Sequence, residues 1–234
     1  MMVTGFNDNR NDTLASWKEG HELADLISHQ LYQIFHFSGS ISPYLKEAIE
    51  RSEKCFCEIN SHYFCDEKTG RVHFSPFRSN QYAMFLYYLS NVAYHDGNID
   101  TAEKIYYLNK SLNGVEWFYE VELPEIFYAD HPLGCVLGRA KYRNYFKTAQ
   151  GCTVGNNHNI YPDISDHVIM HPYSMIIGNS HIGSYVEISA YSFIRDQDIP
   201  SDSLVFGQSP ELKIIKRPHN DMVERFSIFK ERSR

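Results

Sequence analysis

The 234-residue sequence lacks two features, a long apolar run and an excess of basic residues. No stretch approaches the roughly 18 consecutive apolar residues that a membrane-spanning helix needs. Acidic residues number 29 and basic residues 22, so the formal net charge is −7. This acidic balance argues against nucleic acid or an anionic membrane surface as the main partner. The polar start, MMVTGFNDNRND, does not resemble a signal peptide, and we therefore expect a cytoplasmic protein without a membrane span.

Cysteine is also scarce, and the five cysteine residues form no strong metal-binding motif. Cys55, Cys57 and Cys65, with His62 between them, come nearest to a zinc site. Their Cys-x-Cys spacing is tighter than that of structural zinc sites. An odd number of cysteines without an export signal favours reduced, buried thiols. We therefore expect no bound metal.

The first half of the chain has the pattern of a helical domain. Its apolar residues recur at helical spacing, and Ser, Pro and Gly stand where helices begin and end. Most of the aromatic side chains in this half are expected to fill its core. Helices are predicted from Leu14 to about Phe37, from Ser42 to about Cys57, from Ser79 through QYAMFLYYLSNVAY, and from Asp100 to Gly114.

The last third of the chain has a period of six residues. Apolar residues recur at this spacing at Ile164, Met170, Ile176, Ile182, Ile188 and Ile194. Small or β-branched residues follow each of the first five by four positions, at Val168, Ser174, Ser180, Val186 and Ser192. Residues suited to corners lie between them, at Asp166, Pro172, Gly178, Ser184, Ala190 and Asp196. A helix cannot keep a six-residue repeat on one face, so the pattern predicts a β-solenoid of hexapeptides.

Several motifs, in the same order, resemble the serine acetyltransferase branch of the left-handed β-helix acyltransferases. Asp130-His131 precedes GCVLG at 134–138, QGCTVG follows at 150–155, and GQSPELK stands at 207–213 after the regular hexapeptides. The likeness covers roughly residues 80–234. The chain also resembles the O-acetyltransferases of capsule and O-antigen polysaccharides.

The resemblance and the patterns together predict an α+β fold. An N-terminal α-helical domain is expected over 1–114, a left-handed parallel β-helix over 115–215, and a tail or short helix over 216–234. The left hand of the coil is implied only by the resemblance. Members of the family are homotrimers whose active sites lie between neighbouring solenoids, and in this branch two trimers can pair.

The chemistry implied by the resemblance is transfer of an acetyl group from acetyl-CoA to a hydroxyl. An alcohol attacks a thioester efficiently only if a base removes its proton, and imidazole, with an ordinary pKa of about 6.5, suits this task. His131 is the predicted base because it lies in the Asp-His motif. Glu116, fifteen residues earlier, stands where the family has the aspartate that orients the base. Asp130 is predicted to position the acceptor or to orient the base.

Acetyl-CoA is expected to lie in the groove between two solenoids. The turn at Gly155 and Asn156 is the predicted source of a backbone N–H for the oxyanion. The resemblance places the rest of the coenzyme near the corners at Gly178 and Ala190 and near the closing coil. The residues expected there are Gly207 and Lys213.

The predicted acceptor site departs from the family. The Arg-His-Pro that reads an amino-acid acceptor is replaced by Ile160-Tyr161-Pro162, which has no guanidinium for a carboxylate. Tyr161 suits the C–H faces of a sugar. We therefore predict that a sugar hydroxyl of a bacterial surface polysaccharide, or of its precursor, binds at Tyr161 and Asp130. Serine O-acetylation, N-acetylation of a nucleotide sugar, and a non-catalytic scaffold remain as alternatives.

Overall fold

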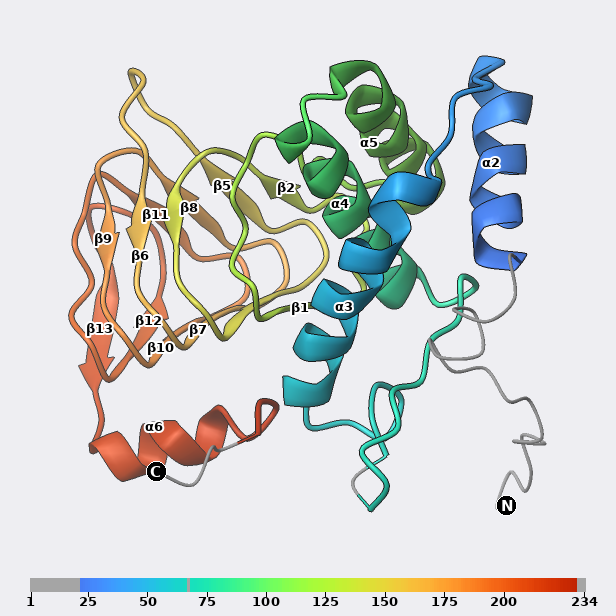
Figure 1. Cartoon of the computed structure of the whole chain (residues 1–234). Helices are drawn as coiled ribbons and strands as arrows, with labels where there is room; N and C mark the ends of the chain where they lie inside the picture. The colour runs from blue at the N-terminus through green and yellow to red at the C-terminus, as the bar shows by residue number, and fades with distance from the viewer. Residues whose placement is uncertain (1–21, 67, 231–234) are drawn as a thin grey trace, which may run out of the picture.

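Helices form the first part of the computed structural model, which describes residues 22–66 and 68–230 (Figure 1). They are α2 (Glu22–Phe35), α3 (Ser42–Glu58), α4 (Ser79–His95) and α5 (Ile99–Asn113). The four predicted helices are confirmed wherever the structure describes them. The expected start of the first helix, at Leu14, lies outside the described residues. None of the described helices could span a lipid bilayer.

The ends of α5 show how the helices lead into the solenoid. Asn98 is its N-cap, and the Asn98 side chain accepts a hydrogen bond from the Thr101 N–H at 3.1 Å. Asp100, where the sequence predicts the helix to begin, therefore lies in its first turn. Gly114 ends the helix with a φ of 65°, a value that glycine adopts without strain. Two residues later, Glu116 already pairs with Val136 of the first coil.

Short strands then form the three walls of a solenoid (Figure 1). The first wall contains β1 (Phe127–Ala129), β4 (Phe146–Thr148), β7 (Val168–Met170), β10 (Val186–Ile188), β12 (Ser203–Phe206) and β13 (Lys213–Lys216). The second wall contains β2 (Val136–Leu137), β5 (Thr153–Gly155), β8 (Met175–Ile177) and β11 (Phe193–Arg195). The third contains β3 (Lys141–Tyr142), β6 (Asp163–Ile164) and β9 (His181–Ile182). The strands of each wall pair in parallel, except that β13 returns antiparallel to β12.

The register of the strands explains the regular and the irregular coils. Val168 pairs with Val186 and Met175 with Phe193, so each of these coils takes three hexapeptides. Thr153, however, pairs with Met175, four residues further along than a regular coil allows. The extra residues form the loop between β5 and β6, which projects beyond the coils (Figure 1).

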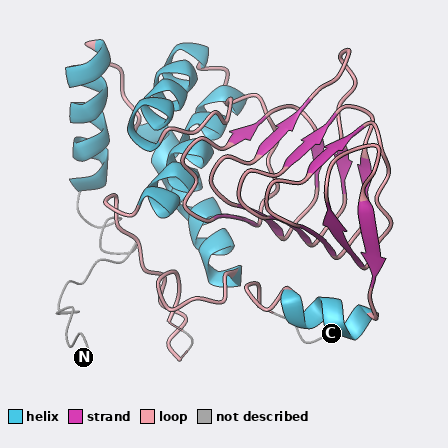
Figure 2. Cartoon of the chain, turned by 180° about the vertical axis from the view of Figure 1, so that it is seen from behind, coloured by secondary structure: helices cyan, strands magenta, loops and turns pink. Residues whose placement is uncertain are grey.

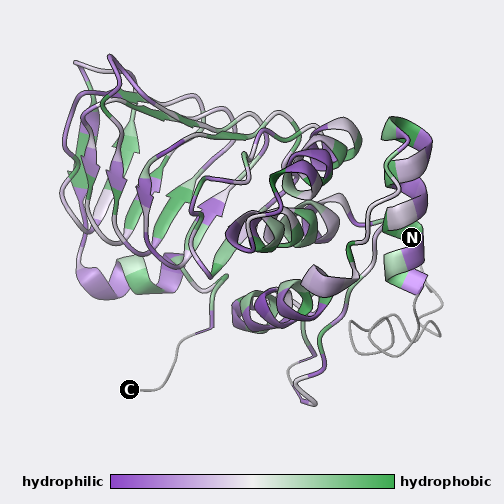
Figure 3. Cartoon of the chain, turned by 45° about the horizontal axis from the view of Figure 1, so that its top comes forward, coloured by the Kyte–Doolittle hydropathy of each residue, from purple (hydrophilic) through white to green (hydrophobic). Residues whose placement is uncertain are grey.

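Both predicted inward registers are confirmed. Every residue of the two registers is at most 1% exposed, including the serines Ser174, Ser180 and Ser192. Hydrophobic and hydrophilic residues alternate along the walls, as Figure 3 shows, because successive side chains of a strand point to opposite faces. The period of six therefore arises from strands that fill a narrow, three-sided interior.

The corners differ in detail from the prediction. Gly178 and Asp196 have positive φ as corner residues, with values of 72° and 50°. At the other four predicted corners the positive φ belongs to the next residue along the chain: His167, Tyr173, Tyr185 and Tyr191. Bulky rings therefore occupy left-handed positions that small residues were expected to take.

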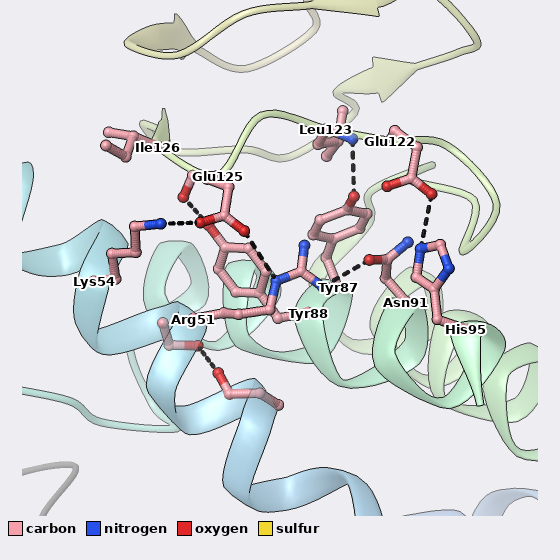
Figure 4. A network of polar contacts seen from close by, with 12 residues as sticks. Arg51, Lys54, Tyr87, Tyr88, Asn91, His95, Glu122, Leu123, Glu125 and Ile126 are labelled. Atoms are coloured by element: carbon pink, nitrogen blue, oxygen red, sulfur yellow. Dashed lines mark hydrogen bonds and ion pairs between the residues drawn. The ribbon is translucent and has the colours of Figure 1, made fainter.

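The helices pack directly onto the first coil. Figure 4 shows Tyr87 and Tyr88 of α4 reaching the segment before β1. Tyr87 accepts a hydrogen bond from the Leu123 N–H at 2.9 Å, and Tyr88 donates one to the Glu125 carbonyl at 3.0 Å. One cluster of buried residues runs through both parts of the chain. The division into separate domains at 114/115 and 215/216 stays a prediction.

The tail contains the short helix α6 (His219–Arg225), which lies against the solenoid near its last strands (Figure 2). Met222 and Phe226 pack onto Ile169 and Leu204 of the first wall. This helix therefore covers the outer face of one wall.

Candidate active site

His131 lies at a corner of the solenoid between β1 and β2. Its side chain is 86% exposed, and its φ is 47°. In the same corner, the Gly134 N–H donates to the Gly114 carbonyl at 2.9 Å, and the Gly151 N–H donates to the Leu133 carbonyl at 3.0 Å. The end of α5 and the next coil thus fix the backbone on both sides of this corner, while the imidazole faces outward.

Asp130 is the carboxylate beside this imidazole. Its Oδ1 lies 3.7 Å from His131 Nε2 and accepts a hydrogen bond of 3.0 Å from the Tyr128 hydroxyl. Its Oδ2 lies 3.5 Å from Lys147 Nζ. Burial raises the pKa of Tyr128, and the neighbouring Asp130 charge raises it further, so the phenol stays protonated and donates. Asp130 is therefore held by two side chains and remains next to His131.

Glu116 does not make the predicted contact with His131. Among the described residues, these two side chains share neither a hydrogen bond nor an ion pair. The Glu116 carboxylate instead accepts hydrogen bonds from Tyr106 and Lys110 of α5. Burial acts to raise the pKa of Glu116, but these two donors hold it below its ordinary value. Asp130 is thus the carboxylate nearer to His131, and the orienting role of Glu116 stays a prediction.

The residues predicted to bind the coenzyme lie along both edges of the second wall. Gly155, Asn156 and Gly178 share one corner, where the Gly178 N–H donates to the Gly155 carbonyl at 3.0 Å. Ala190 and Gly207 lie at the opposite corner, in the column that begins at His131, because Ile188 pairs with Val205. One chain therefore does not bring the predicted coenzyme residues together at a single point.

Two details qualify these positions. The corner at Gly178 holds the Asp196 carboxylate, which accepts hydrogen bonds from the Asn179 N–H at 2.8 Å and from Asn157 Nδ2 at 2.6 Å. Lys213 opens β13, on the last strand pair of the first wall. Lys213, which is predicted to lie near the coenzyme, is thus in the last strand pair of the solenoid, away from the His131 corner.

Tyr161 lies in the projecting loop between β5 and β6 and is 39% exposed. A bridge between Asn157 and Ile160 shapes this loop, together with positive φ at His158 and Asn159. The described contacts of the chain do not join Tyr161 to Asp130. The predicted acceptor pair is therefore not assembled within one chain.

The five cysteines are free thiols, as the sequence favours. Burial raises the pKa of Cys55 to about 12 and that of Cys57 to about 11. Cys57 and Cys65 approach to 3.7 Å between their sulfur atoms. Across residues 22–66 and 68–230, no three His, Cys, Asp or Glu side chains gather as a metal site would require.

Tyr128 and Lys147 are the site residues for which the sequence gives no sign. Tyr128 pairs with Lys147 between β1 and β4, and the Asp130 N–H donates to the Thr148 carbonyl at 2.8 Å. Both residues approach Asp130 because of this register. The first coil is less regular than the later ones, so the hexapeptide count alone does not give the pairing.

Comparison with known proteins supports the fold. No family model matches the chain. The serine acetyltransferase of Staphylococcus epidermidis is 27% identical over 142 aligned residues, which cover 54% of this chain and 61% of that enzyme. The chain thus spans less than two thirds of the length of the curated relatives it matches.

Solved structures agree over most of the chain. The serine acetyltransferase of Neisseria gonorrhoeae superimposes with a TM-score of 0.60 and 20% identity, covering 89% of this chain and 91% of that one. The serine acetyltransferase of Brucella abortus, solved in complex with coenzyme A, gives a TM-score of 0.58 and 17% identity, covering 88% and 94%. The predicted fold, helices followed by a left-handed β-helix, is confirmed.

Proposed function

We propose that the protein is an acetyl-CoA-dependent O-acetyltransferase with His131 as its general base. The observation that carries this proposal is the exposed imidazole of His131, held beside Asp130 at the edge of the β-helix. The similarity to serine acetyltransferases, one of them a coenzyme A complex, supports acetyl-CoA as the acetyl donor. The cytoplasmic location stays a prediction.

The arrangement suits attack by an alcohol on a thioester. His131 accepts the hydroxyl proton as the alcohol oxygen bonds to the acetyl carbonyl carbon. The Asp130 carboxylate stabilises the imidazolium that forms. As the carbon–sulfur bond breaks, the proton passes from His131 to the departing thiolate of coenzyme A. One ester and one thiol result, and His131 returns to its neutral state.

Serine is the acceptor that the comparisons favour. The curated relatives that match are serine acetyltransferases, which places serine ahead of the sugar predicted from sequence. A sugar hydroxyl of a surface polysaccharide remains the second candidate. The observation in its favour is Ile160-Tyr161, where the family has Arg-His, together with the exposed ring of Tyr161.

The walls of the solenoid suggest how copies assemble. The first wall is covered by α6, and the third carries Lys141, Asp163 and His181 outward. The second wall presents mainly apolar side chains, and no described element covers it. Its outward residues are Val136, Thr153, Met175, Ile177, Phe193 and Arg195.

We therefore assign the second wall to contact between copies in a homotrimer. His131, at one edge of this wall, would then lie beside a neighbouring solenoid. This arrangement supplies what one chain lacks, because the coenzyme residues at the opposite corner and the projecting loop with Tyr161 would come from the next copy. Pairing of trimers through the helices stays a prediction.

The test is a thiol-release assay with purified full-length protein and acetyl-CoA. Serine, nucleotide sugars and capsular oligosaccharides serve as acceptors. His131→Ala should lower kcat/KM by about 10²–10⁴-fold, the usual contribution of a general base. His181→Ala is the matched control, because His181 also pairs with an aspartate, Asp198 at 2.8 Å, but on the third wall. Full activity of His131→Ala, or no release with any acceptor, would overturn the proposal.

A further inference from the structure

Lys147 places an ammonium group inside the candidate site. Its Nζ lies 3.5 Å from Asp130 Oδ2 and 5.3 Å from the centre of the Tyr128 ring. The side chain is only 20% exposed. A lysine normally keeps its charge in water, so this position on the outer face of β4 is unusual for a residue that serves only solubility.

The ammonium group of Lys147 has unused hydrogen-bonding capacity. It carries three N–H donors. Among the described residues none accepts a hydrogen bond from it, since 3.5 Å to Asp130 is an ion-pair distance rather than a good hydrogen bond. Within 22–66 and 68–230, the Asp130 side chain accepts a hydrogen bond only from the Tyr128 hydroxyl, although a carboxylate has about four acceptor positions. Both charges can therefore take a further partner.

We propose that Lys147 binds the carboxylate of a hydroxy-amino acid acceptor whose ammonium group pairs with Asp130. This inference rests on the proposed function and names its substrate class. The pair of opposite charges matches a zwitterion, and serine is the smallest amino acid with a hydroxyl. Ile160-Tyr161 provides no cation for the acceptor carboxylate. Lys147 then supplies the positive charge that binds it.

The distances fit such an acceptor. Lys147 and His131 approach different oxygens of Asp130, at 3.5 Å and 3.7 Å. Lys147 Nζ therefore lies within about 9 Å of His131 Nε2. Serine, with its carboxylate and its hydroxyl each making a hydrogen bond of about 2.8 Å, can bridge a separation up to this limit. The hydroxyl of the bound amino acid would thus face the base.

The test compares serine with ethanolamine, which is serine without its carboxylate, in the full-length protein with acetyl-CoA. For Lys147→Met, the ratio of kcat/KM for serine over ethanolamine should fall by about 10- to 100-fold, the usual effect of losing a hydrogen bond between charged groups. The loss should appear mainly as a higher KM for serine. Lys147→Arg keeps the charge and should recover part of the ratio.

Lys141→Met is the matched control, because Lys141 is an exposed lysine that pairs with Asp163 on the third wall. Activity on ethanolamine shows that each variant is folded. The role of Lys147 is overturned if Lys147→Met lowers kcat/KM equally for serine and for ethanolamine. It is also overturned if neutral sugars are acetylated and serine is not. If no acceptor leads to thiol release, the proposed acetyltransferase function is overturned together with the role of Lys147. Thiol release with some acceptors therefore distinguishes a failure of the Lys147 proposal from a failure of the proposed function.

Discussion

At the scale of single residues, aromatic rings stabilise corners that their backbone conformation disfavours. Tyr173 and Tyr191 have φ values of 61° and 60°, and their rings stack at 5.2 Å and 10°. A left-handed conformation costs a non-glycine residue roughly 1–2 kcal/mol. A stacked aromatic pair stabilises the fold by about 0.5–1.5 kcal/mol in addition to the free energy gained from burying its surface. Because the next coil repeats the same corner, the stacked pair offsets part of the backbone cost of its two tyrosines.

His167 belongs to a second stack and gives a testable pH dependence. Its ring lies 4.4 Å from Tyr145 and 4.3 Å from Tyr185. Burial lowers the pKa of His167, although Asp166 acts in the opposite direction. The unfolded chain therefore binds a proton more readily than the folded protein. It follows that the free energy of unfolding falls as the pH decreases through the ordinary histidine range near 6.5.

We expect His167→Tyr to reduce this loss of stability between about pH 7 and about pH 5. Tyrosine suits the position because Tyr185 occupies the same corner with a φ of 56°, one coil further on. Urea denaturation at several pH values measures the effect, with His181→Asn on the third wall as control. An unchanged pH dependence in His167→Tyr would show that His167 does not cause it.

The candidate site shows which contacts between residues can be predicted from the sequence. Asp130 and His131 are neighbours in the chain, so their proximity is predicted without a fold. Glu116 is assigned from the family resemblance, but the position of its side chain depends on how Tyr106 and Lys110 of α5 pack beside it. Lys147 reaches Asp130 only through strand pairing. Contacts within one segment are therefore predictable here, while contacts between coils require the register.

At the scale of secondary-structure elements, the hexapeptide strands could be predicted and the position of α6 could not. The regular coils place an apolar, small or β-branched residue inward at fixed intervals, so the sequence predicts the solenoid. α6 has seven residues, too few to show a helical period, and its place depends on Met222 reaching the first wall. The sequence accordingly predicts only a tail or a short helix there.

An ion pair between Arg225 of α6 and Glu187 of the solenoid also holds α6 in place. Glu187 of β10 lies 2.7 Å from Arg225 Nη1 and 2.7 Å from His171 Nε2. The hydrogen bond from His171 has the largest effect and lowers the pKa of Glu187. Arg225 lowers this pKa as well, and burial acts in the opposite direction. The stabilisation is therefore fully present above the ordinary carboxyl pKa and is lost as the pH falls through the lowered value.

Glu187→Gln should loosen α6 at neutral pH. Loss of the charged contacts is worth about 1 kcal/mol, so hydrogen exchange in the amides of α6 should accelerate about fivefold. As the pH falls toward the acid range, the protection of the α6 amides in the wild-type protein should approach that in Glu187→Gln. Glu224→Gln, an exposed carboxylate on the same helix, is the control. Equal protection in Glu187→Gln and wild type would contradict this account.

At the scale of the whole molecule, the helices and the solenoid share one core around the first coil. Trp117 and Phe127 pack edge to face at 5.9 Å and are both buried, and the Phe127 ring also meets Tyr87 and Tyr88 of α4. The Gly114 carbonyl, at the end of α5, accepts a hydrogen bond from the His131 corner. The helical part therefore supports the candidate site rather than lying beside an independent solenoid. The chain changes from helix to strand at the predicted boundary, residue 114, and the division into domains stays a prediction.

The apolar second wall leads to the last prediction. Met175, at 37% exposure, points outward from the middle of this wall, so Met175→Glu would place a charge where another copy is proposed to dock. We expect the wild-type protein to sediment as a trimer or a pair of trimers and Met175→Glu to sediment as a monomer. Because the proposed site lies between copies, thiol release should fall together with the mass. Lys141→Glu puts the same side chain on the charged third wall and should leave the assembly intact. A monomeric wild type, or a Met175→Glu variant of unchanged mass, would contradict assembly through the second wall.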